Sequence, residues 1–296
     1  MATLRDIKRR IDSVRNTRQI TSAMKMVSTA KLNRAQNQVR AAQPYSEELR
    51  SMVTSISSGL TADDHQLFQS PEGGSSVVML FTSDRGLCGA FNTALCKNLE
   101  RHVAANRETF PDLEIITIGR TGNDYFKKRG FKIRRSVLYA KPDERKLHIK
   151  DLIEELNGAF ISGEVGRLFL AYNHFNNPIS QEPRVTQLLP IAPPKATGVA
   201  GEEKAKDQPA TARELIFEPS REHILDLLLP RYMENQCFLA HLNTEAGEHG
   251  ARMVAMDGAT RNAGDMIERL TLQYNRVRQA AITKELIEIV NGAQAI

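Results

Sequence analysis

The fold is decided by residues 220–296, which read SREHILDLLLPRYMENQCFLAHLNTEAGEHGARMVAMDGATRNAGDMIERLTLQYNRVRQAAITKELIEIVNGAQAI. After Pro230 this stretch contains no proline, and its glycines are single and scattered, so the pattern predicts one continuous helix. At about 1.5 Å per residue, some 75 residues reach about 110 Å, several times the width of a small domain. A helix of this length needs a partner along its side.

The apolar positions of this helix predict a narrow seam for a second helix. Steps of three and four residues, with one seven-residue skip at Gln273, connect Met256, Ala259, Ala263, Met266, Leu270 and Val277. Towards the end the apolar residues become denser, as Ile282, Leu286, Ile287, Ile289 and Val290 follow one another closely. The tip is therefore expected to be apolar around more of its circumference.

The N-terminal segment supplies the expected partner. It runs from Thr3, a plausible N-cap with Asp6 three residues on, toward Gly59. Helical spacing connects Leu4, Ile7, Ile11, Val14, Ile20, Met24, Val27, Leu32, Ala35, Val39, Ala42, Leu49, Val53 and Ile56. Pro44 predicts a kink in this helix and not a domain boundary.

The middle of the chain predicts a small α/β domain. Strand-type apolar runs at Val77–Thr82, Leu113–Ile118, Ile133–Leu138 and Arg167–Phe175 alternate with helical stretches, which is typical of βαβ units and a mostly parallel sheet. Val185–Ile191 and Leu215–Phe217 are expected to complete the sheet as antiparallel edge strands.

The predicted fold is mixed α+β and α/β: an antiparallel coiled coil of two long terminal helices with an inserted Rossmann-like α/β domain. Its parts are the N-terminal helix (1–59), a linker (60–76), the globular domain (77–218, with a mobile loop at 192–213) and the C-terminal helix (219–296). Since the second helix is about 17 residues longer than the first, one helix must overhang as a single helix.

Composition indicates an ordinary soluble chain, because 41% of residues are hydrophobic, 25% are charged and no apolar run could span a bilayer. Met1–Arg10 lacks the apolar run of a secretory signal. The three cysteines, Cys88, Cys96 and Cys237, have no CxxC spacing, so we expect packing residues in a reducing compartment.

The two ends of the chain carry opposite charge. Residues 1–43 hold ten Lys/Arg and two acids, a net charge of +8, whereas residues 222–296 hold seven basic and ten acidic residues, a net charge of −3. Two solvated helix faces would explain this division, and so would two helices lying side by side whose surplus positive charge faces an acidic partner.

Enzyme chemistry is not indicated. The loop Gly86-Leu87-Cys88-Gly89 follows a strand and precedes a helix, where a phosphate loop belongs, but it lacks both the Walker and the dinucleotide fingerprints. Cys88 stands where a nucleophile elbow would place it but lacks the GxSxG pattern, and the seven histidines show no metal-ligand spacing. We expect no catalytic residue, no cofactor and no metal.

A basic helical hairpin that binds nucleic acid is the main alternative. Ten basic residues follow one another along the first helix: Arg5, Lys8, Arg9, Arg10, Arg15, Arg18, Lys25, Lys31, Arg34 and Arg40. No aromatic residues accompany them and no recognised nucleic-acid motif is present, so an acidic protein partner explains these charges equally well.

A resemblance to a known family rests on several motifs. The C-terminal residues ITKELIEIVNGAQA (282–295) match the signature of the gamma subunits of F-type ATP synthases. Lys8–Val27, Thr82–Asn92 (TSDRGLCGAFN), Ala251–Thr260 (ARMVAMDGAT) and Leu270–Ala281 (LTLQYNRVRQAA) resemble that family's characteristic stretches in the same order. The resemblance covers nearly the whole chain.

The resemblance implies a central rotor shaft, without catalysis of its own, that couples ion flow to ATP synthesis or hydrolysis. The implied partners are a hexamer of three alpha and three beta subunits, the epsilon subunit and the c-ring of the membrane sector, with no nucleic acid and no direct insertion into the membrane. Since no transit sequence is seen, the implied location is the cytoplasmic side of a bacterial inner membrane, as a peripheral subunit.

The resemblance also implies residue roles. Arg278 and Gln279 match a pair that contacts a beta-subunit loop, and Met24, Lys25 and Met26 match the adjacent part of the N-terminal helix, with Arg9 and Arg10 adding basic contacts. The bearing tip corresponds to Ile282, Leu286, Ile289 and Val290, and the foot-domain motif to Asp84, Arg85, Gly86, Gly89 and Asn92. No cysteine occurs in the 192–213 loop, which argues against the redox switch of chloroplast members.

Overall fold

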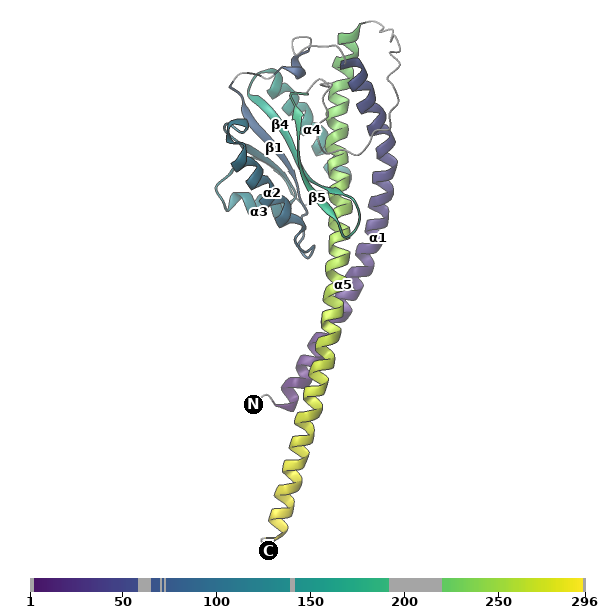
Figure 1. The fold of residues 1–296 in the computed structure, drawn as a ribbon, viewed down its shortest axis with the longest axis vertical. Helices are drawn as coiled ribbons and strands as arrows, with labels where there is room; N and C mark the ends of the chain where they lie inside the picture. The colour runs from purple at the N-terminus through teal and green to yellow at the C-terminus, as the bar shows by residue number, and fades with distance from the viewer. Residues whose placement is uncertain are drawn as a thin grey trace.

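Two long helices and an inserted sheet domain make up the molecule (Figure 1). The computed structural model describes residues 3–57, 65–69, 71, 73–138, 142–191 and 220–294. The first helix, α1, spans Leu4–Ser57, and the last, α5, spans Arg221–Gln294. The predicted mobile loop, the strand at 215–217 and part of the 60–76 linker lie outside the described residues.

Both long helices begin at a capping residue, and Thr3 is the one predicted for α1. The Asp6 amide donates to Thr3 Oγ1 (3.3 Å) and the Thr3 amide donates to Asp6 Oδ2 (3.1 Å), a reciprocal capping box. The His223 amide donates to Ser220 Oγ (3.2 Å). Both helices then continue through an internal proline, so Pro44 does not divide α1, as predicted.

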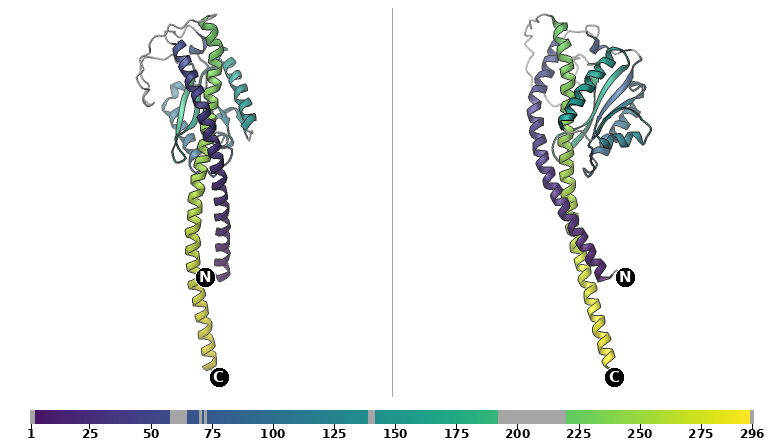
Figure 2. Two further views of the ribbon diagram at one scale, coloured as in Figure 1. Left: turned by 90° about the vertical axis from the view of Figure 1, so that its right-hand side faces the viewer. Right: turned by 180° about the vertical axis from the view of Figure 1, so that it is seen from behind.

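The helices pair antiparallel and α5 overhangs. Figure 2 shows α1 and α5 side by side in both views, with the C-terminal part of α5 continuing alone past the N-terminus. Their lengths of 54 and 74 residues make this overhang unavoidable, as predicted. Within the residues described, neither of these helices nor any other is long and apolar enough to cross a membrane.

The seam of α1 differs from the prediction in its middle. Ile20 and Val27, expected inside, are 61% and 57% exposed, whereas Thr21 and Ser28 are buried. The buried residues from Ile7 to Ile56 all fall on positions of one alternation of four- and three-residue steps, which includes Thr21 and Ser28 but not Ile20 and Val27. In the middle of α1 the register of the helix pair, and not the hydropathy of the residues, therefore determines which side chains are buried. Ile20 and Val27 remain exposed on the outer face of α1.

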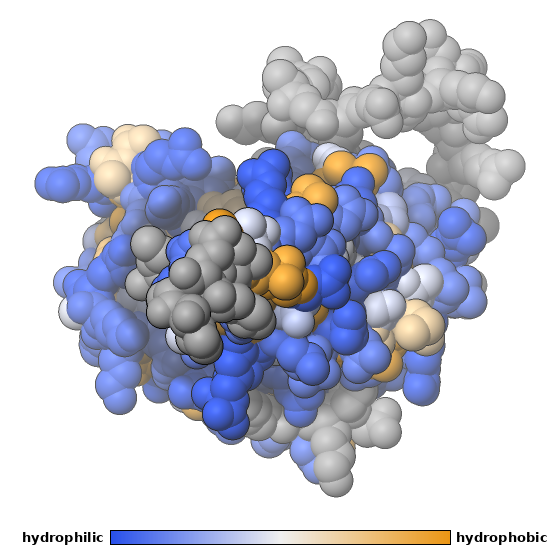
Figure 3. All heavy atoms as spheres, turned by 90° about the horizontal axis from the view of Figure 1, so that it is seen from below, coloured by the Kyte–Doolittle hydropathy of each residue, from blue (hydrophilic) through white to orange (hydrophobic). Residues whose placement is uncertain are grey.

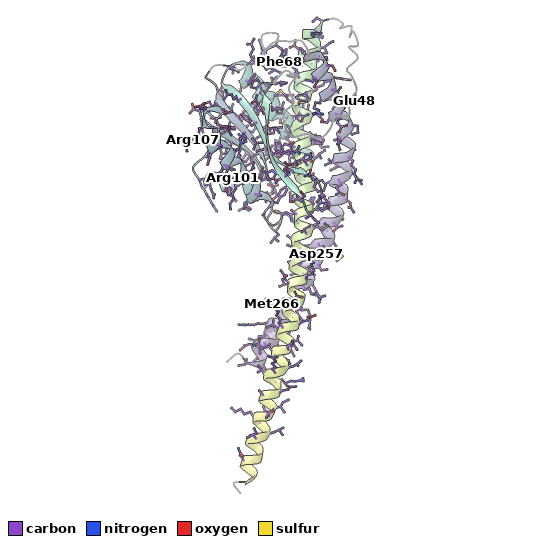
Figure 4. All side chains as sticks on the ribbon, in the orientation of Figure 1. Glu48, Phe68, Arg101, Arg107, Asp257 and Met266 are labelled. Carbon is purple, nitrogen blue, oxygen red and sulfur yellow. The ribbon has the colours of Figure 1, made fainter. Side chains whose placement is uncertain are left out.

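The seam of α5 shifts by one residue for the same reason. Met266 is 53% exposed, and Ile267 is half-buried in its place (Figure 4 marks Met266 on the part of α5 that pairs with α1). Tyr274, also half-buried, fills the seven-residue step that was predicted to skip over Gln273. Thr260 Oγ1 donates to Thr21 Oγ1 (2.8 Å), which joins the two seams directly.

The inserted domain is a five-stranded sheet between helices. In chain order its elements are η2 (Gln66–Phe68), β1 (Ser75–Phe81), α2 (Phe91–Ala105), η3 (Arg107–Thr109), β2 (Glu114–Ile118), α3 (Arg120–Lys127), β3 (Lys132–Val137), α4 (Pro142–Ile161), β4 (Val165–Phe175) and β5 (Gln181–Leu189). The strand order is β3-β2-β1-β4-β5, with β1 to β4 parallel and β5 antiparallel at the edge, as predicted.

Each face of the sheet has its own core, because successive strand residues point to opposite faces. Val77, Met79 and Phe81 of β1 pack with α4 and with the first turns of α5. Val78 and Leu80 pack with α2 and α3 on the other face. The inserted domain therefore uses α5 as one of its own covering helices.

Further along, α5 buries polar side chains beside the inserted domain. His241 and His249 are 4% and 8% exposed. Burial, aided by the positive charges of Arg145 and Lys146, lowers the pKa of His241 to about 3. Burial also lowers the pKa of His249 to about 4. Both rings are accordingly neutral in the folded chain at neutral pH.

The first prediction concerns the apolar contact between α5 and the sheet. Leu229→Ala removes a fully buried side chain and should lower the free energy of unfolding by about 2–5 kcal/mol. Leu227→Ala, at a 57% exposed position two residues away, should change it by less than about 0.5 kcal/mol. Urea unfolding of the purified chain, followed by circular dichroism, measures both. Equal losses would contradict the described packing of α5.

The second prediction concerns acid stability. An unfolded histidine binds a proton near pH 6.5, whereas the folded chain resists protonation of His241 until the pH approaches 3. The free energy of unfolding should therefore fall as the pH drops from about 6.5 towards 4, by up to about 1.4 kcal/mol per pH unit for such a ring. His241→Gln should make this slope shallower, and His223→Gln, at an exposed position of α5, should not. If the pH dependence of the free energy of unfolding were unchanged in His241→Gln, burial of a neutral His241 would not be the source of the acid sensitivity.

Candidate functional site: the outer face of the helix pair and the loop beside α5

The outer face of α1 is strongly basic. Arg9 and Arg10 are exposed, as are most of the other basic residues of this helix. Figure 3 views the molecule from below and shows mainly hydrophilic residues, with a few separate apolar ones. The excess positive charge thus faces outward, where a partner could reach it.

Apolar residues interrupt this basic face at one level. Met26 is 65% exposed and lies next to the exposed Val27, while Met24 is half-buried. Lys25 differs from these neighbours, because its Nζ lies 2.6 Å from Asp257 Oδ1 of α5. Arg261 binds the other oxygen of Asp257 (3.1 Å), and the Lys25 hydrogen bond lowers the pKa of that carboxyl. Lys25 therefore joins the two helices.

The overhang of α5 presents the remaining predicted residues. Arg278 and Gln279 are exposed, and Ile282 and Leu286 are 49% and 57% exposed, with Ile287 at 54%. Ile289 and Val290 belong to α5, but their side chains are outside the described set. An apolar stretch on a single helix lacks cover within the described chain, which is the pattern of a surface made for a partner.

The loop between β1 and α2 holds the motif TSDRGLCGAFN and is anchored at both ends. The Ser83 amide donates to Asn92 Oδ1 (3.0 Å), and Asn92 Nδ2 donates to Ser83 Oγ (2.7 Å). Ser83 Oγ in turn donates to the Arg85 carbonyl (2.7 Å). Gly89 has φ +60°, in the left-handed region that favours glycine. Asn92, the first-turn residue of α2, therefore fixes the shape of the loop.

Asp84 connects the same loop to two further helices. Its Oδ1 accepts from the Arg120 amide at the start of α3 (3.0 Å), and its Oδ2 lies 2.6 Å from Arg145 Nη2 of α4. Both side chains of the ion pair are largely buried. Asp84 thus holds the loop against α3 and α4.

Arg252 of α5 closes the loop from the remaining side. Its guanidinium donates to the Gly86 carbonyl (3.2 Å from Nη2) and to the Arg85 carbonyl (3.3 Å), and it forms an ion pair with Glu248 (2.8 Å). A cavity of about 660 Å³ lies beside these contacts, between α1, the loop, α4 and α5. The loop therefore meets four helices.

These contacts bear on the enzyme-type interpretations considered for the loop. A phosphate loop presents backbone N–H donors to its ligand, whereas the Asp84 carboxylate and the Arg85 and Gly86 carbonyls of this loop are acceptors that bond to helices of the chain itself. Burial raises the pKa of the Cys88 thiol, which disfavours the thiolate that a nucleophile would need. Cys88, Cys96 and Cys237 are all buried free thiols, as expected.

Several residues of this arrangement were not singled out from the sequence. Arg252 lies inside the ARMVAMDGAT stretch, and Arg145 lies in α4 with no motif around it. Asp257 is one of several acids on α5, and nothing local indicates its pairing with Lys25. Only the position of Arg252 within a recognisable stretch could have drawn attention to it.

Comparison with known proteins gives a consistent result. A family model described as ATP synthase matches residues 3–296. An ATP synthase gamma chain of Geotalea daltonii is 46% identical over 296 residues, covering all of this chain and 99% of that protein. An ATP synthase gamma chain of an Anaeromyxobacter species (strain Fw109-5) is 43% identical over 299 residues, covering all of both proteins.

Among solved structures, one chain of the Euglena gracilis mitochondrial ATP synthase (OSCP/F1/c-ring, rotational state 3) has the same fold. The TM-score is 0.69 at 22% sequence identity, and the match covers 99% of this chain and 94% of that chain. With the full-length match to the family model and to the bacterial relatives, the chain belongs to the family of ATP synthase gamma chains.

Proposed function

We propose that the protein is the central rotor shaft of a bacterial ATP synthase, with α1 and α5 as the shaft and the inserted domain as its foot. The observation that carries this proposal is the overhang: α5 extends beyond α1 as a single helix that exposes Ile282, Leu286 and Ile287, which an external sleeve would cover. A shaft that turns inside a ring of similar subunits needs such an end. Family membership supports the same role.

The proposed mechanism is mechanical. Ion flow through the membrane sector turns the c-ring, the foot turns with it, and the shaft presents different faces in turn to three catalytic beta subunits. The chain itself performs no bond chemistry in this scheme, and its described residues contain no cluster of potential metal ligands. The strand order of the foot supports the description of a Rossmann-like domain.

The proposed partners follow from the exposed surfaces. The basic outer face of α1 and the exposed Met26 would meet acidic and apolar groups of the beta subunits, together with Arg278 and Gln279. The overhanging tip would turn in an apolar sleeve of the alpha and beta ring. The foot would bind the epsilon subunit and the c-ring, which places the chain on the cytoplasmic face of the inner membrane as a peripheral subunit.

The working division of the chain is residues 1–59 and 219–296 for the shaft, 60–76 for the linker and 77–218 for the foot. In this proposed division α5 belongs to both the shaft and the foot, because its first turns also complete the core of the foot. The foot and the shaft therefore share this helix.

The third prediction tests the proposed function directly. Mixed with the alpha and beta subunits of the same enzyme, the chain should assemble at one copy per hexamer and raise ATP hydrolysis. Native mass spectrometry and an ATPase assay measure both effects. If the chain instead ignored the hexamer and bound DNA with a steep dependence on salt, the basic-hairpin alternative would replace the shaft.

The fourth prediction tests the proposed contact at the base of the overhang. Replacing Arg278 and Gln279 with alanine should lower ATP turnover at least roughly tenfold, because one lost hydrogen bond to a charged group, worth about 1.5–3 kcal/mol, already corresponds to a factor of about 10 to 150. Assembly should remain intact, since both side chains are exposed in this chain. Arg269→Ala, at an exposed position of α5 nearer the foot, is the control. Turnover equal to that of the control would remove the pair from the contact surface.

A further inference from the structure

We propose that the loop at 82–92 is the joint through which torque passes between foot and shaft, and that Arg252 is the positioning residue of this joint. The inference rests on the proposed rotary function and assigns a mechanical role to the motif TSDRGLCGAFN at 82–92. Each step follows from contacts that the loop makes.

The loop at 82–92 moves with the foot, because three helices of the foot, α2, α3 and α4, hold the loop in place. Asn92 of α2 fixes Ser83, the Arg120 amide of α3 binds Asp84, and Arg145 of α4 forms a largely buried ion pair with Asp84. These bonds approach from different elements, so the loop cannot turn without the domain. It is thereby a rigid part of the foot.

Arg252 connects this rigid part to α5. Arg252 is only 9% exposed, and its guanidinium donates hydrogen bonds to two consecutive carbonyls of the loop, those of Arg85 and Gly86. Glu248, one turn earlier on α5, holds the guanidinium from behind (2.8 Å), and His249 Nδ1 lies 3.4 Å from Arg252 Nη1. The contacts with Glu248 and His249 thus fix the orientation of the planar guanidinium group towards the loop.

Two glycines bring the foot close to α5 at the same level. A Cβ on Gly247 would lie 2.8 Å from the ring of Phe91, the first residue of α2. A Cβ on Gly250 would lie 3.0 Å from the Cα of Pro178, in the turn between β4 and β5. The absence of side chains at these positions lets the foot contact the helix surface directly around Arg252.

The kind of contact matters for transmitting rotation. The apolar contacts between the first turns of α5 and the sheet are non-directional, so they resist separation more than sliding. Hydrogen bonds weaken steeply when their angle changes, and a buried arginine bonded to backbone carbonyls therefore resists twisting. The joint lies where α5 leaves the foot and continues as the shaft (Figure 1).

The test uses the complete enzyme in sealed vesicles and compares ATP-driven proton pumping with ATP hydrolysis. Arg252→Met keeps a long side chain but removes the hydrogen bonds. It should lower the protons pumped per ATP hydrolysed at least about threefold, while hydrolysis by the detached hexamer with its shaft stays near the wild-type rate. Amide exchange at Ser83 and Arg120 should rise about tenfold as the loop loses a charged hydrogen bond.

Two further variants complete the design. Arg252→Lys keeps the charge but loses the fork, so it should recover only part of the pumping ratio; it also serves if Arg252→Met does not assemble. Arg231→Met, at an exposed position of α5 beside the foot, should pump normally. If Arg252→Met and Arg231→Met pumped the same number of protons per ATP hydrolysed, the proposed role of Arg252 in the joint would be wrong. Failure of the wild-type chain to activate the hexamer would instead overturn the proposed function.

Discussion

The structure depends on a continuous alternation of three- and four-residue steps shared by two helices of unequal length. Because α1 and α5 keep this repeat without a skip, they can lie along one another over the whole of α1. The repeat leaves α5 unpaired beyond the N-terminus, and it also decides which side chains face inward. The exposure of Ile20 and Val27 follows from this register, and the overhang follows from the unequal lengths of the two helices.

The register explains both the success and the failure of sequence reasoning about the helices. Their existence, caps, antiparallel pairing and overhang could be predicted because proline positions, capping residues and length are local features. The seam in its middle could not, because Ile20 and Val27 satisfy an apolar pattern while the register requires Thr21 and Ser28. Where the apolar pattern and the helix register differ by one residue, the packing against the partner helix determines which side chain is buried. That packing cannot be read from the sequence of one helix alone.

The loop at 82–92 shows a different limit. Its place between a strand and a helix could be predicted, and the resemblance marked it as a foot motif, but its role depends on Arg120, Arg145 and Arg252, which come from three other helices. No spacing in the sequence connects these residues. The pairing of Lys25 with Asp257, 232 positions apart, escaped for the same reason.

The uncovered end of α5 has a consequence for how the cell handles the free subunit. Without a partner, the end of α5 exposes the apolar side chains of Ile282, Leu286 and Ile287. Exposed apolar surface of this kind promotes aggregation and binding by chaperones. In the proposed complex a sleeve would cover this surface, so the apolar side chains would be exposed only on a copy that has not assembled.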